Sequence, residues 1–219
     1  MSASVTIEQH TAGPVQDGSR RDFLTLITTV GAAIGAGAVA WPFINSMDPA
    51  RDTLAAGVPI DVDLGKIQEG QQIIALWRGS PIFVLRRSKQ ALARLQDPTL
   101  TGRLRDPQSS VHQQPAYAEN WHRSVRQEFA VLVGICTHLG CVPTLYSKPD
   151  ATVPVENWPG GYFCHCHGSK YDLAGRVHAG VPAPYNPPVP RYVFTNDTTV
   201  QIGENPPGDD FALNSVVQM

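Results

Sequence analysis

The pattern of hydrophobic and polar positions changes several times along the N-terminal part of the chain. Residues 1–22 are mostly polar, and residues 23–47 form an apolar run without a charged side chain. Because a helix rises about 1.5 Å per residue, about 20 such residues can cross a hydrocarbon core of about 30 Å. The run therefore predicts one transmembrane helix over residues 23–47. Residues 48–59, which include Gly57 and Pro59, follow neither a strand nor a helix pattern and predict a flexible hinge.

After the hinge, the chain changes to short runs rich in β-branched and aromatic residues, separated by turn residues. Such runs predict strands, and pairs of runs around short turns predict hairpins. The predicted strands cover residues 72–77, 81–86, 129–134, 160–163, 191–195 and 198–202. Residues 88–96 predict a short helix with Ser88 as its N-cap. Residues 97–126 are polar, and we expect this connection on the surface. It contains His112 and His122, to which we assign no ligand role.

The composition favours a β-rich fold. The 219 residues include 42% hydrophobic residues, 16% charged residues, 19 prolines and 19 glycines. Abundant Pro and Gly with few charged residues are typical of a loop-rich β protein rather than a helical bundle. The formal charge of −2 provides no basic excess for binding nucleic acid. We therefore predict a mainly β fold, in which an antiparallel β-sheet domain follows one N-terminal transmembrane helix.

Two arginines stand directly before the apolar run. Arg20 and Arg21 match a twin-arginine export signal. Only Arg51 closely follows the run, so the positive-inside rule places the N-terminus in the cytoplasm. Residues 38–40 (Ala-Val-Ala) resemble a small-residue cleavage site, which would remove the segment. The apolar run nevertheless continues to Ile44, beyond the length of a typical signal core, and we expect a retained anchor.

All four cysteines lie in two short stretches, residues 136–141 (Cys-Thr-His-Leu-Gly-Cys) and residues 164–169 (Cys-His-Cys-His-Gly-Ser). Two thiolates and two imidazoles delivered from two loops suit a 2Fe–2S cluster with Cys ligands on one iron and His ligands on the other. The expected ligands are Cys136, His138, Cys164 and His167. The remaining cysteines, Cys141 and Cys166, can close a disulfide between the loops.

A structural zinc site is the main alternative for these residues. Four cysteine thiolates at short spacing favour tetrahedral zinc. However, Cys164-x-Cys166 is tighter than the usual ligand spacing, and a four-cysteine site would leave His138 and His167 without a role. Unligated core cysteines would not explain why cysteine and histidine pair in two places.

The two stretches, with Lys-Tyr-Asp directly after the second, resemble the cluster boxes of the Rieske iron–sulfur subunit of quinol–cytochrome c reductase, the cytochrome bc complex. The resemblance extends from the N-terminal anchor to about Glu204. It implies a Rieske-type β domain over residues 60–204, with its cluster-binding part at about 129–187, and leaves residues 205–219 as a tail. His165 stands where this family usually has proline, and the sequence does not reveal its role.

The resemblance also implies roles for individual side chains. The hydroxyl groups of Ser169 and Tyr171 would donate hydrogen bonds to cluster or cysteine sulfur. His167 would face the quinol and act as the catalytic residue. Leu139 and the proline segment at 182–184 would shape an apolar surface that docks on the membrane partner.

The implied function is that of an electron-transfer subunit of an oxidoreductase complex. It would oxidise quinol, expected to be ubiquinol, at the membrane and pass the electron to a c-type cytochrome by movement of the head domain. The implied partners are a cytochrome b subunit, a c-type cytochrome subunit and membrane lipid, in a dimeric complex. The implied location is the inner membrane, with a single span and the cluster domain in the periplasm.

Two other Rieske proteins are alternatives. The Rieske subunit of an exported oxidase, such as an arsenite oxidase, also carries a twin-arginine signal, but it serves a soluble partner and needs no retained anchor. An oxygenase-type Rieske ferredoxin is a cytoplasmic carrier. That class generally lacks the extra cysteine pair and has no export signal.

Overall fold

The computed structural model of the chain describes residues 18–48, 57–153, 155 and 157–217. The chain forms two compact units, residues 1–50 and residues 51–219. The described part of the second unit, residues 57–217 with the gaps given above, is called the head domain below. The predicted hinge at 48–59 lies mostly outside the described residues.

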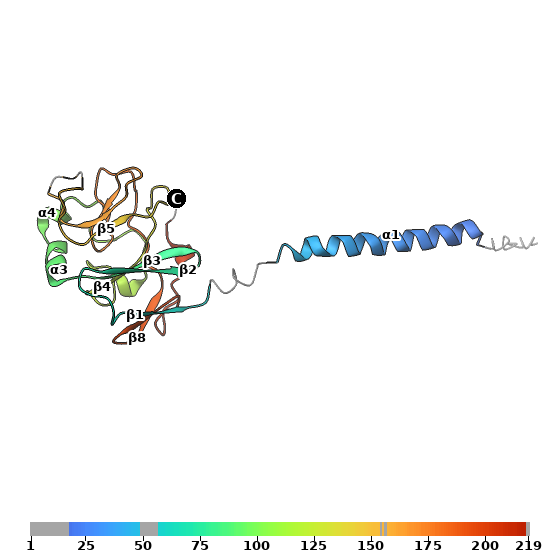
Figure 1. The fold of residues 1–219 in the computed structure, drawn as a ribbon, viewed down its shortest axis with the longest axis horizontal. Coiled ribbons are helices and arrows are strands. Elements are labelled where there is room, and N and C mark those ends of the chain that lie inside the picture. Colours follow the sequence, from blue (N-terminus) through green and yellow to red (C-terminus); the bar gives the residue numbers. More distant parts are fainter. Residues whose placement is uncertain (1–17, 49–56, 154, 156, 218–219) are drawn as a thin grey trace, which may run out of the picture. The chain divides into compact units, whose positions relative to one another are not determined.

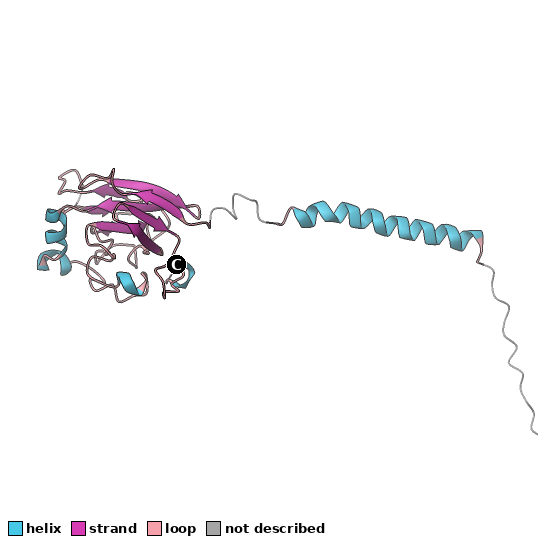
Figure 2. Cartoon of the chain, turned by 90° about the horizontal axis from the view of Figure 1, so that it is seen from below, coloured by secondary structure: helices cyan, strands magenta, loops and turns pink. Residues whose placement is uncertain are grey.

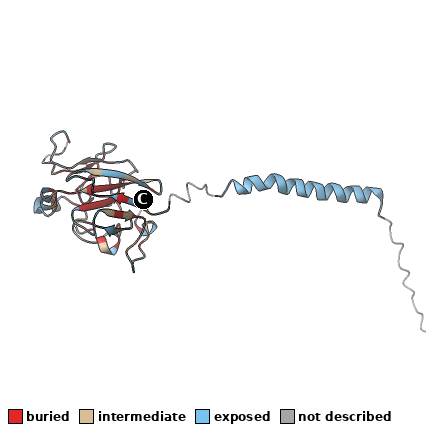
Figure 3. Ribbon diagram, turned by 60° about the horizontal axis from the view of Figure 1, so that its bottom comes forward, coloured by how far each residue is buried: buried red, intermediate tan, exposed pale blue. Residues whose placement is uncertain are grey.

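The first unit contains helix α1 (Arg20–Asn45). The Ser19 hydroxyl accepts a hydrogen bond from the Asp22 N–H, and the Asp22 carboxylate accepts one from the Ser19 N–H. This capping box begins the helix before the predicted position, so the arginine pair lies inside its first turn. The helix ends before Met47, and every residue in it is exposed (Figure 3). Among the described residues it is the one helix long and apolar enough to cross a membrane.

The described part of the head domain contains three antiparallel sheets of three strands each (Figures 1 and 2). The first has the order β1 (Ile60–Asp63), β9 (Thr199–Ile202), β8 (Tyr192–Asn196). The second has the order β2 (Gln72–Trp77), β3 (Ser80–Arg86), β4 (Phe129–Val133). The third has the order β5 (Thr144–Tyr146), β6 (Gly161–Phe163), β7 (Lys170–Tyr171).

The second sheet contacts both of the others. Phe83 on β3 stacks on Tyr162 of β6, with ring centroids 5.4 Å apart. Phe129 on β4 meets Phe194 of β8 at 6.3 Å. All residues of β4 are buried, as expected for a strand covered on both faces. The core therefore lies around the second sheet, and the strand that leads into the first cysteine stretch is part of it.

Most predicted elements are present with small shifts. The turn between β2 and β3 has two residues, Arg78 and Gly79, both with positive φ, whereas a three-residue turn was predicted. Helix α3 (Lys89–Leu95) begins after Ser88, whose hydroxyl accepts a hydrogen bond from the Ala91 N–H as predicted. The sequence did not indicate the short helices α4 (Pro98–Thr101), η1 (Ala116–Ala118) and η2 (Leu213–Ser215). The short strands β1, β5 and β7 were also not among the predicted strands.

The prediction that residues 97–126 lie on the surface holds only in part, because buried residues stand between exposed ones along this connection. Five polar residues of this connection are buried, namely Ser109, Gln113, Gln114, Arg123 and Ser124. Their side chains bond to backbone carbonyls and to one another, and this compensates their removal from water. The polar composition therefore reflects an internal hydrogen-bonded network as well as solvent exposure, the latter for example at Arg105, Ser110 and His112.

The predicted tail packs on the head domain as far as residue 217. Phe211 and Val216 are buried. The Val217 N–H donates to the carbonyl of His112, and the His112 ring meets Phe211 edge to face at 5.6 Å. These contacts place the end of the described chain beside the first cysteine stretch, whose groove Val217 lines.

Candidate metal centre

The two cysteine stretches form loops with the same backbone hydrogen bonds. In the first loop, which follows β4, the Cys136 N–H donates to the Cys141 carbonyl at 2.7 Å, and the Gly140 N–H donates to the Cys136 carbonyl at 3.0 Å. In the second loop, which follows β6, the Cys164 N–H donates to the Ser169 carbonyl at 2.8 Å, and the Gly168 N–H donates to the Cys164 carbonyl at 2.9 Å.

Both loops turn through a glycine in the left-handed region, with φ of +83° at Gly140 and +75° at Gly168. The loops can therefore be compared position by position, from the first residue to the sixth. The first position is a cysteine and the fifth a glycine in both loops. The remaining pairs are Thr137 with His165, His138 with Cys166, Leu139 with His167, and Cys141 with Ser169.

Cys141 and Cys166 form a disulfide that joins the two loops. Cys136 and Cys164 are free thiols, and both are buried. The four-cysteine zinc site is therefore excluded in this structure, because two of its ligands are bonded to each other. The cysteine pair left for a metal is the one at the first position of each loop.

The two candidate histidines lie together at the outer side of the loops. The ring centroids of His138 and His167 are 4.8 Å apart, with the ring planes at 89°. His138 is half-buried and His167 is exposed. Next to them, the Leu139 side chain is 71% exposed. The site thus offers two sulfur ligands inside the protein and two imidazole ligands at its surface.

Tyr171 lies against the buried sulfur of the first loop. Its hydroxyl is 3.2 Å from Cys136 Sγ and accepts a hydrogen bond from the Thr137 N–H at 3.1 Å. Burial raises the pKa of Tyr171, so the phenol keeps its proton. The oxygen accepts from the loop N–H, and its proton can be donated to Cys136 Sγ or to the Thr137 hydroxyl oxygen, each 3.2 Å away.

Ser169 ends the second loop and is fully buried. Its hydroxyl oxygen accepts a hydrogen bond from the Ala183 N–H at 3.1 Å. No described protein group accepts the hydroxyl proton in return. A buried donor of this kind needs an acceptor, and a cluster sulfur within the site would supply one.

The proline segment at 182–184 and the residue after it, Tyr185, are bonded to the two loops. Ala183 contacts Ser169 as described, and the Thr137 hydroxyl donates to the Tyr185 carbonyl at 2.6 Å. Beside the first loop lies an open groove of about 470 Å³, whose lining includes His138, Leu139 and Tyr185. Tyr185, which directly follows the proline segment, therefore forms part of one wall of this groove.

The donor set fits a 2Fe–2S cluster. Burial raises the pKa of the Cys164 thiol, although the N–H groups of Cys166 and His167 act on it in the opposite sense. A buried thiolate without a metal is therefore costly, and iron would compensate its charge. Two thiolates and two neutral imidazoles match the mixed ligation that distinguishes this class from four-cysteine clusters.

Comparison with known proteins adds independent evidence. The Rieske [2Fe-2S] domain family matches residues 108–193, and a family described as the TAT signal of the ubiquinol–cytochrome c reductase Fe–S subunit matches residues 11–50. The ubiquinol–cytochrome c reductase iron-sulfur subunit of Allochromatium vinosum is 45% identical over 188 residues, covering 85% of this chain and 89% of the relative. The chain belongs to the Rieske iron–sulfur subunit family.

Proteins of the same name from two further organisms are similar. The Bradyrhizobium diazoefficiens subunit is 43% identical and covers 88% of this chain and 99% of its own length. The Rhodospirillum rubrum subunit is 45% identical, with coverage of 89% and 98%. These findings confirm the Rieske-type β fold and the 2Fe–2S cofactor that the sequence predicted. The relatives are named for the reductase and not for an arsenite oxidase.

The signal match and helix α1 together fit a single-pass, membrane-anchored Rieske subunit. The signal match covers the arginine pair and the whole of α1. As in the sequence prediction, the arginine pair lies at the N-terminal end of the apolar segment.

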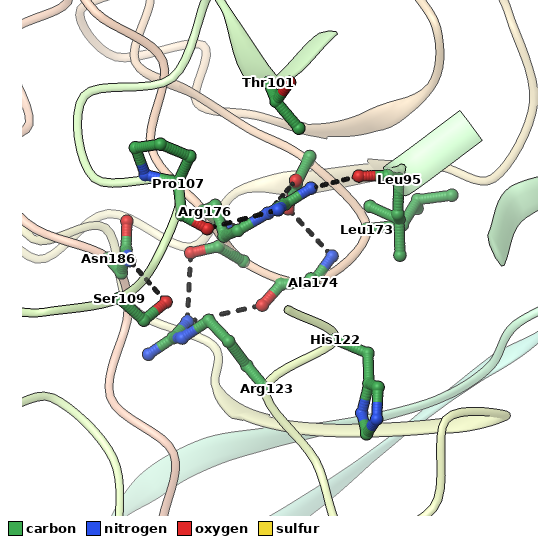
Figure 4. A network of polar contacts seen from close by, with 12 residues as sticks. Leu95, Thr101, Pro107, Ser109, His122, Arg123, Leu173, Ala174, Arg176 and Asn186 are labelled. Carbon is green, nitrogen blue, oxygen red and sulfur yellow. Dashed lines mark hydrogen bonds and ion pairs between the residues drawn. The ribbon is translucent and has the colours of Figure 1, made fainter. Parts of the chain in front are cut away.

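A set of buried arginines behind the loops escaped the sequence analysis (Figure 4). Arg123 donates to the carbonyls of Ala174, Gly175 and Pro187 and to the Gln114 side chain. It therefore links the segment after the second loop, the chain just beyond the proline segment at Pro187, and the connection that was expected on the surface.

Two further arginines belong to this set, and the three buried arginines Arg87, Arg123 and Arg176 are called the arginine frame below. Arg176 pairs with the Asp172 carboxylate at 2.6 Å and also donates to the Leu95 carbonyl. Arg87 donates to five oxygens, including the Ser124 hydroxyl and the Phe129 carbonyl. Burial lowers the pKa of Arg87 to about 10, so it remains charged at neutral pH. The Asp172-x-x-x-Arg176 spacing, which the sequence analysis did not use, is a feature of the sequence that could have indicated this pair.

Proposed function

We propose that Cys136, His138, Cys164 and His167 hold one 2Fe–2S cluster, and that the chain is the electron-transferring Rieske subunit of a ubiquinol–cytochrome c reductase. The observation that carries the proposal is the pair of buried free thiols beneath two adjoining surface imidazoles, on loops of equal backbone geometry. When bound, a cluster with His ligands supplies a one-electron acceptor at about −150 to +300 mV, against about −400 mV for plant-type ferredoxins.

His167 is proposed as the residue that meets the quinol. Its ring is exposed and follows the buried Cys164 in the same loop, so it links the solvent side of the site to the metal side. A ligand imidazole keeps an N–H on its far nitrogen. Oxidation of the bound cluster would make that proton easier to lose, and the far nitrogen, once deprotonated, could accept a proton from a quinol hydroxyl. The exposed Leu139 side chain beside it supplies apolar surface for docking on a membrane partner.

Tyr171 and Ser169 are proposed to tune the centre. Each offers a buried hydroxyl proton, one beside Cys136 Sγ and one at the end of the second loop. A hydrogen bond to sulfur withdraws negative charge and makes an added electron less costly. Both residues therefore favour the reduced state and raise the potential.

The partners that suit this role are a cytochrome b subunit, which presents the quinol, and a c-type cytochrome subunit, which accepts the electron. The anchor would remain in the inner membrane as a single span with its N-terminus in the cytoplasm, so the cluster domain would lie in the periplasm. We further propose that the complex is a dimer, with the chain in contact with membrane lipid.

The ligand assignment is tested by neighbouring substitutions in the first loop. In washed membranes, His138→Ala should abolish the Rieske-type electron paramagnetic resonance signal. Leu139→Ala, the matched control at the next position, should keep the full signal while slowing quinol oxidation. A full signal in His138→Ala would refute the assignment.

Head-domain movement is tested separately in the hinge, whose residues 49–56 lie outside the described part of the chain. One cluster that serves a quinol site and a distant haem has to travel, since electron transfer falls steeply with distance. The whole predicted hinge, residues 48–59, spans at most about 40 Å when extended. As a flexible coil, it averages about 20 Å from end to end.

Replacing Leu54, Ala55 and Ala56 by proline should therefore cut turnover severely while cluster content and midpoint stay unchanged. Ala55→Ser alone, which keeps the hinge flexible, should retain normal turnover. Normal turnover in the triple proline variant would show that the head domain need not move.

A further inference from the structure

His165 is the residue of the second loop that the mechanism leaves without a role. It occupies the second position of that loop, between Cys164 and Cys166, and its side chain is exposed. We propose that His165 is a positioning residue that anchors the second loop to strand β5. The anchor is its contact with Tyr146, where the ring Nε2 lies 3.3 Å from the phenol oxygen.

The first loop has a side-chain anchor at the same position. Thr137 is equivalent to His165, and its hydroxyl bonds to the Tyr185 carbonyl at 2.6 Å and lies 3.2 Å from the Tyr171 hydroxyl. Thus the residue directly after the first cysteine ties each loop to a neighbouring segment through its side chain. In the second loop this role falls to His165.

Ring packing supports the anchor. The His165 ring meets Phe163 edge to face, with centroids 4.8 Å apart, and Tyr146 lies at 6.4 Å. Phe163 belongs to a small core cluster with Val153 and Trp158, and Tyr146 packs against this cluster. His165 therefore rests on a packed base that includes residues of β5 and β6.

The position matters because the loop carries two groups that must be held in place. Cys166 crosses to the first loop through the disulfide, and His167 faces His138. A proline at position 165 would stiffen the backbone itself by fixing its own φ. With histidine there, the side-chain contact to β5 supplies the restraint.

The test measures how well the loop is held. In the purified full-length holo-protein, the rate of disulfide reduction by dithiothreitol reports opening around Cys166. His165→Ala should raise this rate about five-fold, the factor that corresponds to a net hydrogen bond of about 1 kcal/mol. Tyr146→Phe should raise it in the same way, and the double variant should be no faster than His165→Ala, because both changes remove one contact.

Two further variants separate the anchor from general loosening. His165→Gln, which can still reach the Tyr146 hydroxyl, should restore most of the protection. Thr144→Ala, an exposed change on the same strand as Tyr146, should leave the rate unchanged. As a second readout, the paramagnetic spectrum should broaden in His165→Ala and keep its shape in His165→Gln.

A wild-type reduction rate in His165→Ala or in Tyr146→Phe would overturn the proposal, and so would a His165→Gln variant as fast as His165→Ala. If His165→Ala fails to accumulate, the disulfide reduction rates of Tyr146→Phe and His165→Gln still test whether His165 anchors the second loop. The spectrum rests on the ligand assignment proposed above, but the disulfide readout does not. A wild-type protein without a Rieske-type spectrum would count against the assignment alone.

Discussion

The first and second loops of the metal centre have the same backbone hydrogen bonds but distribute their functional side chains differently. The histidine proposed as a ligand is His138, at the third position, in the first loop. In the second loop it is His167, at the fourth position. The disulfide joins the sixth position of the first loop, Cys141, to the third of the second. The sixth position of the second loop is instead Ser169, a buried hydroxyl.

This difference shows that the same backbone turn can present two different sets of functional side chains. The shared backbone places one free cysteine of each loop in the interior. The remaining positions then decide which loop contributes a disulfide sulfur from its end and which contributes a hydroxyl. The predictions below change equivalent positions in turn, from the largest expected effect to the smallest.

Removing the disulfide should have the largest effect on stability. Cys141→Ala removes the disulfide, whose two cysteines are 25 residues apart in the sequence. In the chain-entropy model such a link contributes about 3.5 kcal/mol to the free energy of unfolding. Urea unfolding of the metal-free chain should show this loss, and the holo-protein a smaller one, because a cluster held by the proposed ligands would bridge the same loops. Ser169→Ala, at the equivalent position, should lose clearly less, and equal losses would contradict this account.

Mild acid should weaken the arginine frame beneath the loops through His122. Burial, and then the charge of Arg87, lower the pKa of His122 to about 4. The folded state therefore binds the proton less readily than the unfolded state, whose histidine has a pKa of about 6.5. The contribution of His122 is complete above that pH and is lost as the pH falls towards 4.

Because the His122 ring is only half-buried, we expect a loss of about 1.5 kcal/mol rather than the full value of the shift. Urea midpoints at pH 7 and pH 4.5 would measure it. The difference should shrink in His122→Gln, which does not titrate. An unchanged difference in that variant would assign the acid sensitivity to other groups.

The loop glycines should respond equally. Gly140→Ala and Gly168→Ala each place a side chain at positive φ, and an added Cβ would meet no atom within 4 Å at either site. Strain alone then acts, at about 1 kcal/mol for each variant. Matched losses in urea unfolding would support the equivalence of the loops. A loss in one variant several times that in the other would break it.

The hydroxyl groups should produce the smallest effect, in the potential. Ser169→Ala and Tyr171→Phe should each lower the midpoint by about 40 mV, the equivalent of about 1 kcal/mol for one electron. A redox titration followed by the paramagnetic signal would measure it. Tyr117→Phe, which removes a hydroxyl bonded to the Tyr192 N–H, is the control and should leave the midpoint in place. Unchanged midpoints in both loop variants would make these residues turn formers only.

Much of the fold was accessible from local patterns. The apolar run indicated the helix, and alternation and turn residues located most of the strands, because both depend on neighbours in sequence and on transfer from water. The helix began earlier than predicted because the Ser19 cap acts before the apolar run starts. The ligand candidates could also be proposed, because cysteine and histidine have few reasons to recur together.

The tertiary structure decided the contacts between distant segments. Arg123 resembled a surface residue of a polar connection, yet it is buried against carbonyls more than 50 positions away. Thr137 and Tyr185 were not selected in advance, since their bond joins segments that only the fold brings together. His165 was noted in the sequence, but its partner could not be named, because Tyr146 lies on strand β5, apart from the second loop in the sequence. Composition and spacing determined which elements and which ligands this chain could have. Burial and partner geometry, which depend on residues far apart in sequence, decided how they are held.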